Sequence, residues 1–149
     1  MKIKLVLSDE NHDIVADFLT KHGIEIDDSS EFVLIEQNRY PQHLTVKDGR
    51  GERALISVDD IVLIETFGHT VSVVTADGEY TSQLRLYQLE LTLDPARFLR
   101  ISNSVIIQRN KIKRILPSLS MRFVLEMCNS RRVDVTRSYY LKFKEYFKI

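Results

Sequence analysis

Residues 61–82 read IVLIETFGHTVSVVTADGEYTS and carry the clearest structural signal in the chain. Apolar and β-branched residues predominate in this stretch, and Asp77-Gly78 separates two such runs. An Asp-Gly pair between two β-forming runs is typical of a tight hairpin turn. We therefore predict that residues 61–83 are strands.

The flanking segments extend this β-rich region in both directions. Before it, LTVKDGRGERALIS (residues 44–57) places two apolar runs around Gly49 and Gly51, as in a hairpin with a glycine-bearing loop. After it, a leucine-rich segment over 82–93 predicts one short helix, which Asp94-Pro95 ends. The remaining apolar patterns predict five strands and a closing amphipathic helix: strands at 98–101, 105–107, 112–116, 121–128 and 131–135, and the helix over 139–147.

The first 40 residues follow a different pattern. A strand over 2–7 leads to Ser8 or Asp9 as a helix N-cap, and the helix ends near His22 because Gly23 can adopt the left-handed conformation. The run FVLI (residues 32–35) predicts a second strand, which makes a βαβ-like unit. Such a unit is too small to bury a sufficient core, so we expect it to dock on another surface.

These patterns predict an α+β chain with two parts. A small acidic βαβ-like segment occupies residues 1–43, and a mostly β domain with short helices occupies residues 44–149. The segment from Gln37 to Gln42 is the expected linker between them.

The net charge of zero hides a strong asymmetry between the two ends of the chain. Residues 1–46 hold four Lys and Arg against nine Asp and Glu, whereas residues 97–149 hold thirteen Lys and Arg against three acids. Such a distribution fits a half that faces a polyanion, and it fits an ordinary solvated basic surface equally well. Charge alone leaves both interpretations open.

Several classes of protein find no support in the sequence. Signal-peptide and membrane-span patterns are missing, which predicts a cytoplasmic protein. The single cysteine, Cys128, is expected to be an ordinary strand residue in a reducing compartment. No combination of a nucleophile and base, phosphate loop or metal cluster stands out, so we predict neither an enzyme nor a cofactor. The three histidines of the N-terminal half are interpreted as surface residues: His12, His22 and His43.

Three polar residues interrupt the β-rich region at predicted loops. His69 lies between two strands, where it is an ordinary loop residue or a side chain projected outward. Asn103 stands between two serines and can bond adenine or merely stabilise a turn. Arg137 precedes the last helix and can reach guanine, contact phosphate or remain solvated. Their joint occurrence in a basic region favours a binding function.

Residues from about 45 to 149 resemble a LytTR DNA-binding domain. The resemblance rests on ISVDDIVLIETFGHTVSV, a leucine-rich helix, RFLRISNSVIIQRNKIKRI and VDVTRSYYLKFKEYF. It implies a β-rich domain that lays loops into successive major grooves, with His69, Asn103 and Arg137 touching bases. It also implies weaker phosphate contacts by five residues: Ser104, Arg109, Lys111, Lys113 and Arg114. The family often has His or Arg at the position of Ser102 and Asn at that of Gln108, so this chain departs from it there.

The resemblance further implies the partners of this chain. The first is double-stranded DNA, bound by a dimer or by paired monomers at tandem sites, and the acidic segment offers a place for a regulatory membrane partner. A phosphoreceiver domain is not expected, because residues 1–43 are too few for its five-stranded fold. The alternative function is a protein-interaction module, for example an antagonist of another regulator, that acts through the acidic N-terminal segment.

Overall fold

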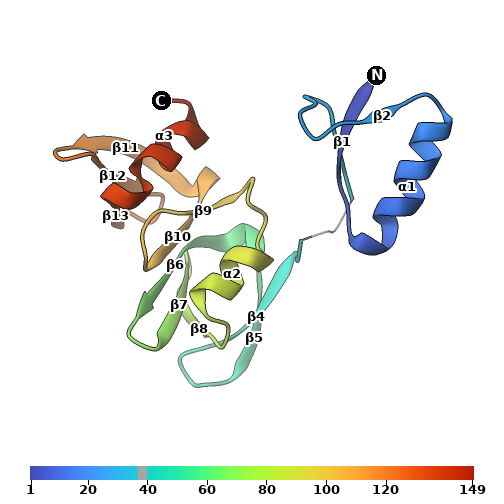
Figure 1. The fold of residues 1–149 in the computed structure, drawn as a ribbon. Coiled ribbons are helices and arrows are strands. Elements are labelled where there is room, and N and C mark those ends of the chain that lie inside the picture. The colour runs from blue at the N-terminus through green and yellow to red at the C-terminus, as the bar shows by residue number, and fades with distance from the viewer. Residues whose placement is uncertain (37–39) are drawn as a thin grey trace. The chain divides into compact units, whose positions relative to one another are not determined.

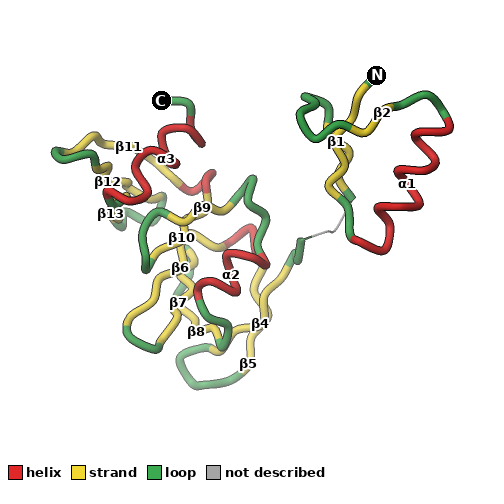
Figure 2. The backbone as a smooth tube through the Cα atoms, viewed as in Figure 1, coloured by secondary structure: helices red, strands yellow, loops and turns green. Residues whose placement is uncertain are grey.

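The computed structural model describes residues 1–36 and 40–149 and divides the chain into two compact units, Met1–Tyr40 and Pro41–Ile149. The expected linker from Gln37 to Gln42 lies outside the described residues in its first half. Strands predominate in the C-terminal unit, whose helices are short, whereas one longer helix is the main element of the N-terminal unit (Figure 2). Each helix in the two described ranges is too short or too polar to cross a membrane.

The N-terminal unit is a three-stranded parallel sheet with one helix, as the βαβ pattern predicted (Figure 1). The central strand β1 pairs with both of its neighbours. The elements are β1 (Lys2–Val6), α1 (Asp9–Lys21), β2 (Glu25–Ile26) and β3 (Val33–Ile35). Gly23 has the expected left-handed conformation, with φ of +79°. The two-residue strand β2 was not predicted.

The start of α1 differs from the prediction in its capping group. Ser8 occupies the N-cap position, but the acceptor for its backbone N–H is the Glu36 carboxylate, 2.8 Å away. The same carboxylate accepts a bond from the Asn11 side chain. The Ser8 side chain makes no capping bond, so the Glu36 carboxylate fixes the start of α1 by bonding the N-cap backbone and the Asn11 side chain.

The C-terminal unit is built on a seven-stranded antiparallel sheet in the order β5-β4-β8-β7-β6-β10-β9. Its strands and the short helix that follows β8 are β4 (His43–Lys47), β5 (Arg53–Ser57), β6 (Ile61–Phe67), β7 (Thr70–Thr75), β8 (Glu79–Ser82), α2 (Leu86–Thr92), β9 (Phe98–Arg100) and β10 (Val105–Gln108). These bounds confirm the predicted hairpins, the helix that ends before Asp94-Pro95, and the strand break at Ser102-Asn103-Ser104.

A second antiparallel sheet, β11-β12-β13, and the last helix complete this unit. They are β11 (Ile112–Ser118), β12 (Arg122–Met127), β13 (Arg132–Val135) and α3 (Tyr140–Phe147). β11 continues through Pro117, which is tolerated because β11 is an edge strand. The prediction that Cys128 is a strand residue is wrong: β12 ends at Met127, and Cys128 is exposed in the turn that follows.

The central strands of the large sheet, β6, β7 and β10, are buried on both faces, and this explains their sequences. On β10, Ile106 packs with α2 in one apolar cluster, while the adjacent Ile107 packs with β12, β13 and α3 in the other. Ile64 and Leu63 divide in the same way on β6. Because successive side chains of a strand point to opposite faces, a strand covered on both faces is an unbroken apolar run.

Candidate nucleic-acid interface

Three turns meet at one end of the large sheet, and each carries one predicted base-reading residue. The β6–β7 turn carries His69, the β9–β10 loop carries Asn103, and the short 3-10 turn after β13 (Arg137–Tyr139) carries Arg137. Backbone bonds tie these turns together: the Thr66 N–H donates to the Ser104 carbonyl at 2.9 Å, and the Thr136 N–H donates to the Ile101 carbonyl at 3.0 Å. The path of each turn can be followed in Figure 1.

Asn103 and Arg137 line the same open groove of about 490 Å³. Both side chains belong to exposed residues, and exposed Ser104 lies beside them. Four arginines contribute to the lining, from β12, β13 and the turns around them: Arg122, Arg131, Arg132 and Arg137. The groove therefore combines a cluster of positive charge with an amide and a hydroxyl, the groups that proteins use on phosphates and base edges.

Beneath this groove lies a nearly buried carboxylate. Glu65 on β6 is 7% exposed and accepts two bonds from Arg131, at 2.6 and 2.9 Å. The Glu65 carboxylate raises the pKa of Arg131, chiefly through this hydrogen bonding. Such a pair removes the repulsion that an unpaired carboxylate would exert on a nucleic-acid backbone.

The other arginines of the groove keep their charge available to an anion. Within residues 1–36 and 40–149, Arg122, Arg132 and Arg137 form no ion pair, and all three are exposed. Positive charge at this site therefore exceeds what the neighbouring carboxylates neutralise.

His69 lies in a neighbouring but separate pocket of about 280 Å³. Arg85 and Tyr87 line this pocket, as does Arg100, whose guanidinium also donates to the Asn103 carbonyl at 2.6 Å. The structure thus brings Asn103 and Arg137 into one groove and connects His69 to them through Arg100.

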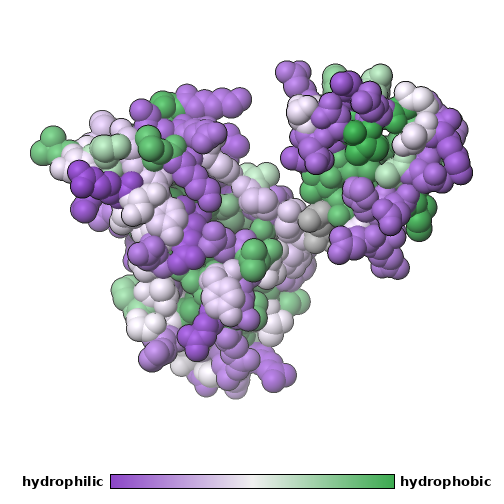
Figure 3. Space-filling view, viewed as in Figure 1, coloured by the Kyte–Doolittle hydropathy of each residue, from purple (hydrophilic) through white to green (hydrophobic). Residues whose placement is uncertain are grey.

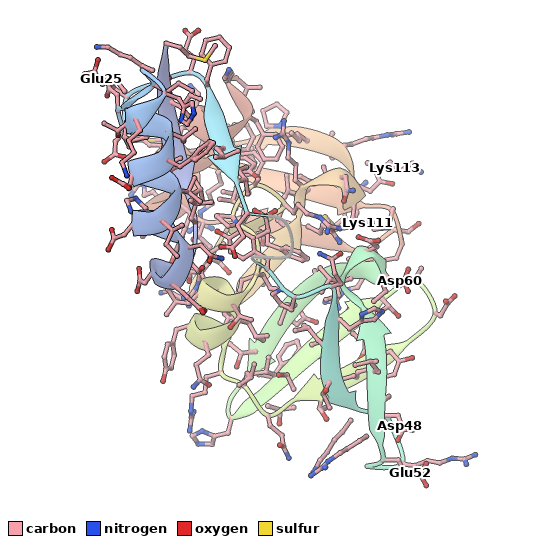
Figure 4. The ribbon with its side chains drawn as sticks, turned by 90° about the vertical axis from the view of Figure 1, so that its right-hand side faces the viewer. Glu25, Asp48, Glu52, Asp60, Lys111 and Lys113 are labelled. Atoms are coloured by element: carbon pink, nitrogen blue, oxygen red, sulfur yellow. The ribbon has the colours of Figure 1, made fainter. Side chains whose placement is uncertain are left out.

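Most of the predicted phosphate contacts lie elsewhere. Ser104 is in the groove, but the other four, Arg109, Lys111, Lys113 and Arg114, follow the opposite end of β10. Four strand residues span roughly 13 Å, so these residues form a second basic cluster. Figure 4 shows Lys111 and Lys113 in this cluster and Asp48 and Glu52 on the distant β4–β5 loop.

Aromatic rings and one carboxylate organise the second basic cluster. The guanidinium of Arg109 lies over the rings of Tyr146 and Phe147, at 5.4 and 5.5 Å. Lys113 and Arg114 lie 3.8 and 3.9 Å from the Glu126 carboxylate. Cation–π contacts thus hold Arg109 near α3, while Glu126 lies near the two basic residues of β11, and all three basic residues remain exposed.

The two departures from the LytTR pattern occupy buried positions. Gln108 is fully buried; its amide donates to the carbonyls of Val58 and Ile61 and accepts from Arg97. Ser102 is 6% exposed and accepts from the Ser104 N–H. Both residues support the backbone; Gln108 is enclosed in the core, whereas Ser102 lies at the floor of the groove.

Sequence reasoning missed several residues of the site. Arg122, Arg131 and Arg132 were assigned to strands and counted in the basic excess of the C-terminal part, and Arg100 and Tyr139 were assigned to a strand and a helix. The pairs that define their roles join residues far apart in sequence, as in Glu65 with Arg131. The only local signal was the arginine pair at 131–132.

Comparisons with known proteins identify the family of the β-rich domain. Residues 51–148 match the family described as LytTr DNA-binding domain. The solved LytTr DNA-binding domain of a Bacillus cereus protein superposes with a TM-score of 0.70 at 26% identity, over 73% of this chain and 99% of that one.

Two curated transcriptional regulators are similar in sequence to more than half of this chain. A heme-containing CO-sensing transcriptional regulator, RcoM 1 of Paraburkholderia xenovorans (strain LB400), is 33% identical over 61% of this chain, which spans only 34% of that protein. An uncharacterized HTH-type transcriptional regulator of Staphylococcus aureus (strain NCTC 8325 / PS 47) is 26% identical over 78% of this chain and 77% of its own length.

Proposed function

Since the chain belongs to the family of LytTR DNA-binding domains, we propose that it is a transcription regulator that binds double-stranded DNA sequence-specifically. Its turns enter successive major grooves. Asn103 and Arg137 read bases from the shared groove, and His69 reads from the neighbouring pocket. The observation that carries this proposal is the open basic groove in which an amide and a free arginine lie together.

The chemistry of the two groove residues suits base edges. An Asn side chain can accept from adenine N6 and donate to N7, and an Arg side chain can donate to guanine O6 and N7. Arg137 has no carboxylate partner among the described residues, so its donors are available. Each such bidentate contact is worth about 1–3 kcal/mol of discrimination against the wrong base.

Phosphate binding is assigned to the basic residues around the turns. Ser104, Arg122 and Arg132 lie in the groove with the base readers. Arg109, Lys111, Lys113 and Arg114 are proposed to contact the backbone at a second position, since they form a separate cluster. The logarithm of the association constant falls linearly with the logarithm of the salt concentration, and each neutralised phosphate makes this slope steeper by about 0.9.

The test is selection of bound duplexes from a random pool, with variants of the groove. We expect the wild-type protein to enrich a motif, and Arg137→Ala and Asn103→Ala each to lose preference at one position of it. Matched controls are Arg50→Ala and Asn110→Ala, exposed residues of the same types away from the three turns. The proposal fails if no motif emerges, or if the groove variants enrich the same motif as the wild type.

The N-terminal unit is proposed to be a dimerisation element that pairs two copies on tandem sites. One face of its sheet is covered by α1, while the other presents Val33 and Ile35, which are 47% and 60% exposed. Hydrophobic residues gather in this unit over β1 and β3 (Figure 3). Parallel sheets are normally covered on both faces, so an additional surface is needed. Binding of a different protein there is the alternative function.

A further inference from the structure

We propose that Arg100 and Tyr139 are positioning residues that hold Asn103 in its base-reading orientation. This inference rests on the proposed function, because it assigns two supports to one of the base readers. Neither residue was predicted from the sequence as part of the site.

Arg100, at the end of β9, fastens the backbone of the loop that carries Asn103. Its Nε donates to the Ser102 carbonyl at 3.0 Å, and its Nη2 donates to the Asn103 carbonyl at 2.6 Å. Two carbonyls of successive residues are thus held by one planar group. Bonds from a charged guanidinium are about twice as strong as neutral ones, and the fork geometry sets their direction.

The third nitrogen of Arg100 connects the loop to the apolar core. Nη1 donates to the Glu90 carboxylate on α2 at 2.9 Å. α2 is itself anchored by Leu86 and Leu89, which are buried in the core cluster. The Arg100 side chain is only 19% exposed, so water competes little for these bonds. The loop is therefore attached to a rigid helix through one arginine.

Tyr139 acts on the side chain of Asn103 instead of its backbone. Its hydroxyl donates to the Asn103 Oδ1 at 3.3 Å. Oδ1 has a second lone pair for the N6 amino group of adenine, and Nδ2 remains free to donate to N7. The phenol thus orients the amide through one lone pair of Oδ1 and leaves the other lone pair and the Nδ2 donors available to the base. Tyr139 comes two residues after Arg137, so the same turn contributes both groups.

The two supports differ in strength. The Arg100 bonds are short and charge-assisted, whereas the Tyr139 bond is long and neutral, so Arg100 carries the larger effect. Holding the loop before binding reduces the conformational entropy that is lost when Asn103 meets its base. Loss of either support should weaken discrimination at that base pair and leave non-specific binding unchanged.

The experiment measures the affinity of the full chain for two duplexes. The first is the duplex that the wild-type protein selects from the random pool. The second is the same duplex with one base pair replaced, namely the pair for which the Asn103→Ala variant loses its preference. We expect Arg100→Lys, which keeps the charge but not the fork, to lower the ratio of these affinities roughly tenfold. Tyr139→Phe should lower it roughly threefold to fivefold. In the Asn103→Ala background both changes should have no further effect on the ratio.

Matched controls exist at the other end of β9 and in α3. Arg97, like Arg100, donates to a carboxylate and to an amide oxygen, which here belong to Asp59 and to the Gln108 side chain, and Arg97→Lys changes it in the same way. Tyr146→Phe removes a hydroxyl that bonds the Ala96 carbonyl at 2.8 Å. Both should leave the affinity ratio unchanged, and thermal unfolding followed by circular dichroism shows whether each variant is folded.

The outcomes separate this inference from the function on which it rests. If Asn103→Ala lowers the ratio while Arg100→Lys and Tyr139→Phe do not, only the positioning role is wrong. If Asn103→Ala itself leaves the ratio unchanged, the base-reading role of Asn103 is wrong, and the positioning role is overturned with it. Should Arg100→Lys fail to fold, Tyr139→Phe alone decides the question.

Discussion

The N-terminal unit (residues 1–40) and the C-terminal unit (residues 41–149) differ in how much of their apolar surface each covers by itself. In the described part of the N-terminal unit, Leu5 is the one buried hydrophobic residue, and α1 buries none. The C-terminal unit contains two buried apolar clusters, one on each face of its large sheet. The C-terminal unit can therefore account for its own stability, whereas the N-terminal unit needs another surface.

The charges of the two units differ in parallel. Acids outnumber bases in residues 1–46, and bases outnumber acids strongly from residue 97 onward. Burial and charge therefore divide the chain in the same way. The C-terminal unit, which has its own buried core, carries the basic groove, and the N-terminal unit, which lacks such a core, is acidic. Three measurements test whether the two units differ in this way.

The largest expected effect is that of a truncation in the core of the C-terminal unit. Leu125 on β12 is fully buried, and Leu125→Ala should lower the free energy of unfolding of this unit by about 2–5 kcal/mol. Leu5→Ala, the matched change in the N-terminal unit, should leave that transition in place. Urea unfolding followed by far-UV circular dichroism measures both. Equal shifts of the main transition would show that the two units unfold as one.

A smaller effect is expected from charges placed on the open sheet face. Val33→Asp or Ile35→Asp should weaken self-association of the chain roughly tenfold, because each removes an apolar side chain from the proposed dimer interface. Sedimentation measures the monomer–dimer equilibrium, with Leu55→Asp on the exposed face of β5 as control. A wild-type chain that stays monomeric alone and on a tandem-site duplex contradicts the dimer and favours a different protein partner.

The smallest effect concerns Asp27 in the N-terminal unit. Its pKa is lowered from 3.8, first by hydrogen bonds from the Ser29 hydroxyl and N–H and then by Lys2. A carboxyl with a lowered folded-state pKa adds stability above its unfolded pKa, and this stability is lost as the pH falls through the folded value. Below about pH 4 the N-terminal unit should therefore loosen, and Asp27→Asn should remove part of this pH dependence. Hydrogen exchange of its amides at several pH values measures the difference; identical profiles would exclude the role.

Much of the fold could be predicted because its signals are local. Apolar runs at residues 61–64 and the Asp77-Gly78 turn act through neighbours in the chain, and the structure confirms the strands and hairpins that they predict. The short helix that ends before Asp94-Pro95 is confirmed for the same reason. Two features were not predicted. Strand β2 exists because Glu25 pairs in register with Lys2, and β12 ends before Cys128 because its last paired residue is Met127. Both depend on pairing with distant residues.

The candidate site divides in the same way. His69, Asn103 and Arg137 could be singled out from the sequence, because each is a polar residue at a predicted loop and matches a family position. Their arrangement could not be predicted, since one shared groove for Asn103 and Arg137 requires the β9–β10 loop and the turn after β13 to lie together. The supports of the site are also non-local: Tyr139 is 36 residues from Asn103, and Arg131 is 66 residues from Glu65.

By itself, the sequence determined the type and order of most elements and the acidic and basic parts of the chain, and it singled out the candidates for base reading. Only the tertiary structure decided which of these residues share a groove, which arginines are neutralised by carboxylates, and that Arg109 and its basic neighbours form a separate cluster. The physical reason is that strand propensity and turn geometry act over a few residues, whereas charge pairing and loop support depend on distances set by sheet register and packing.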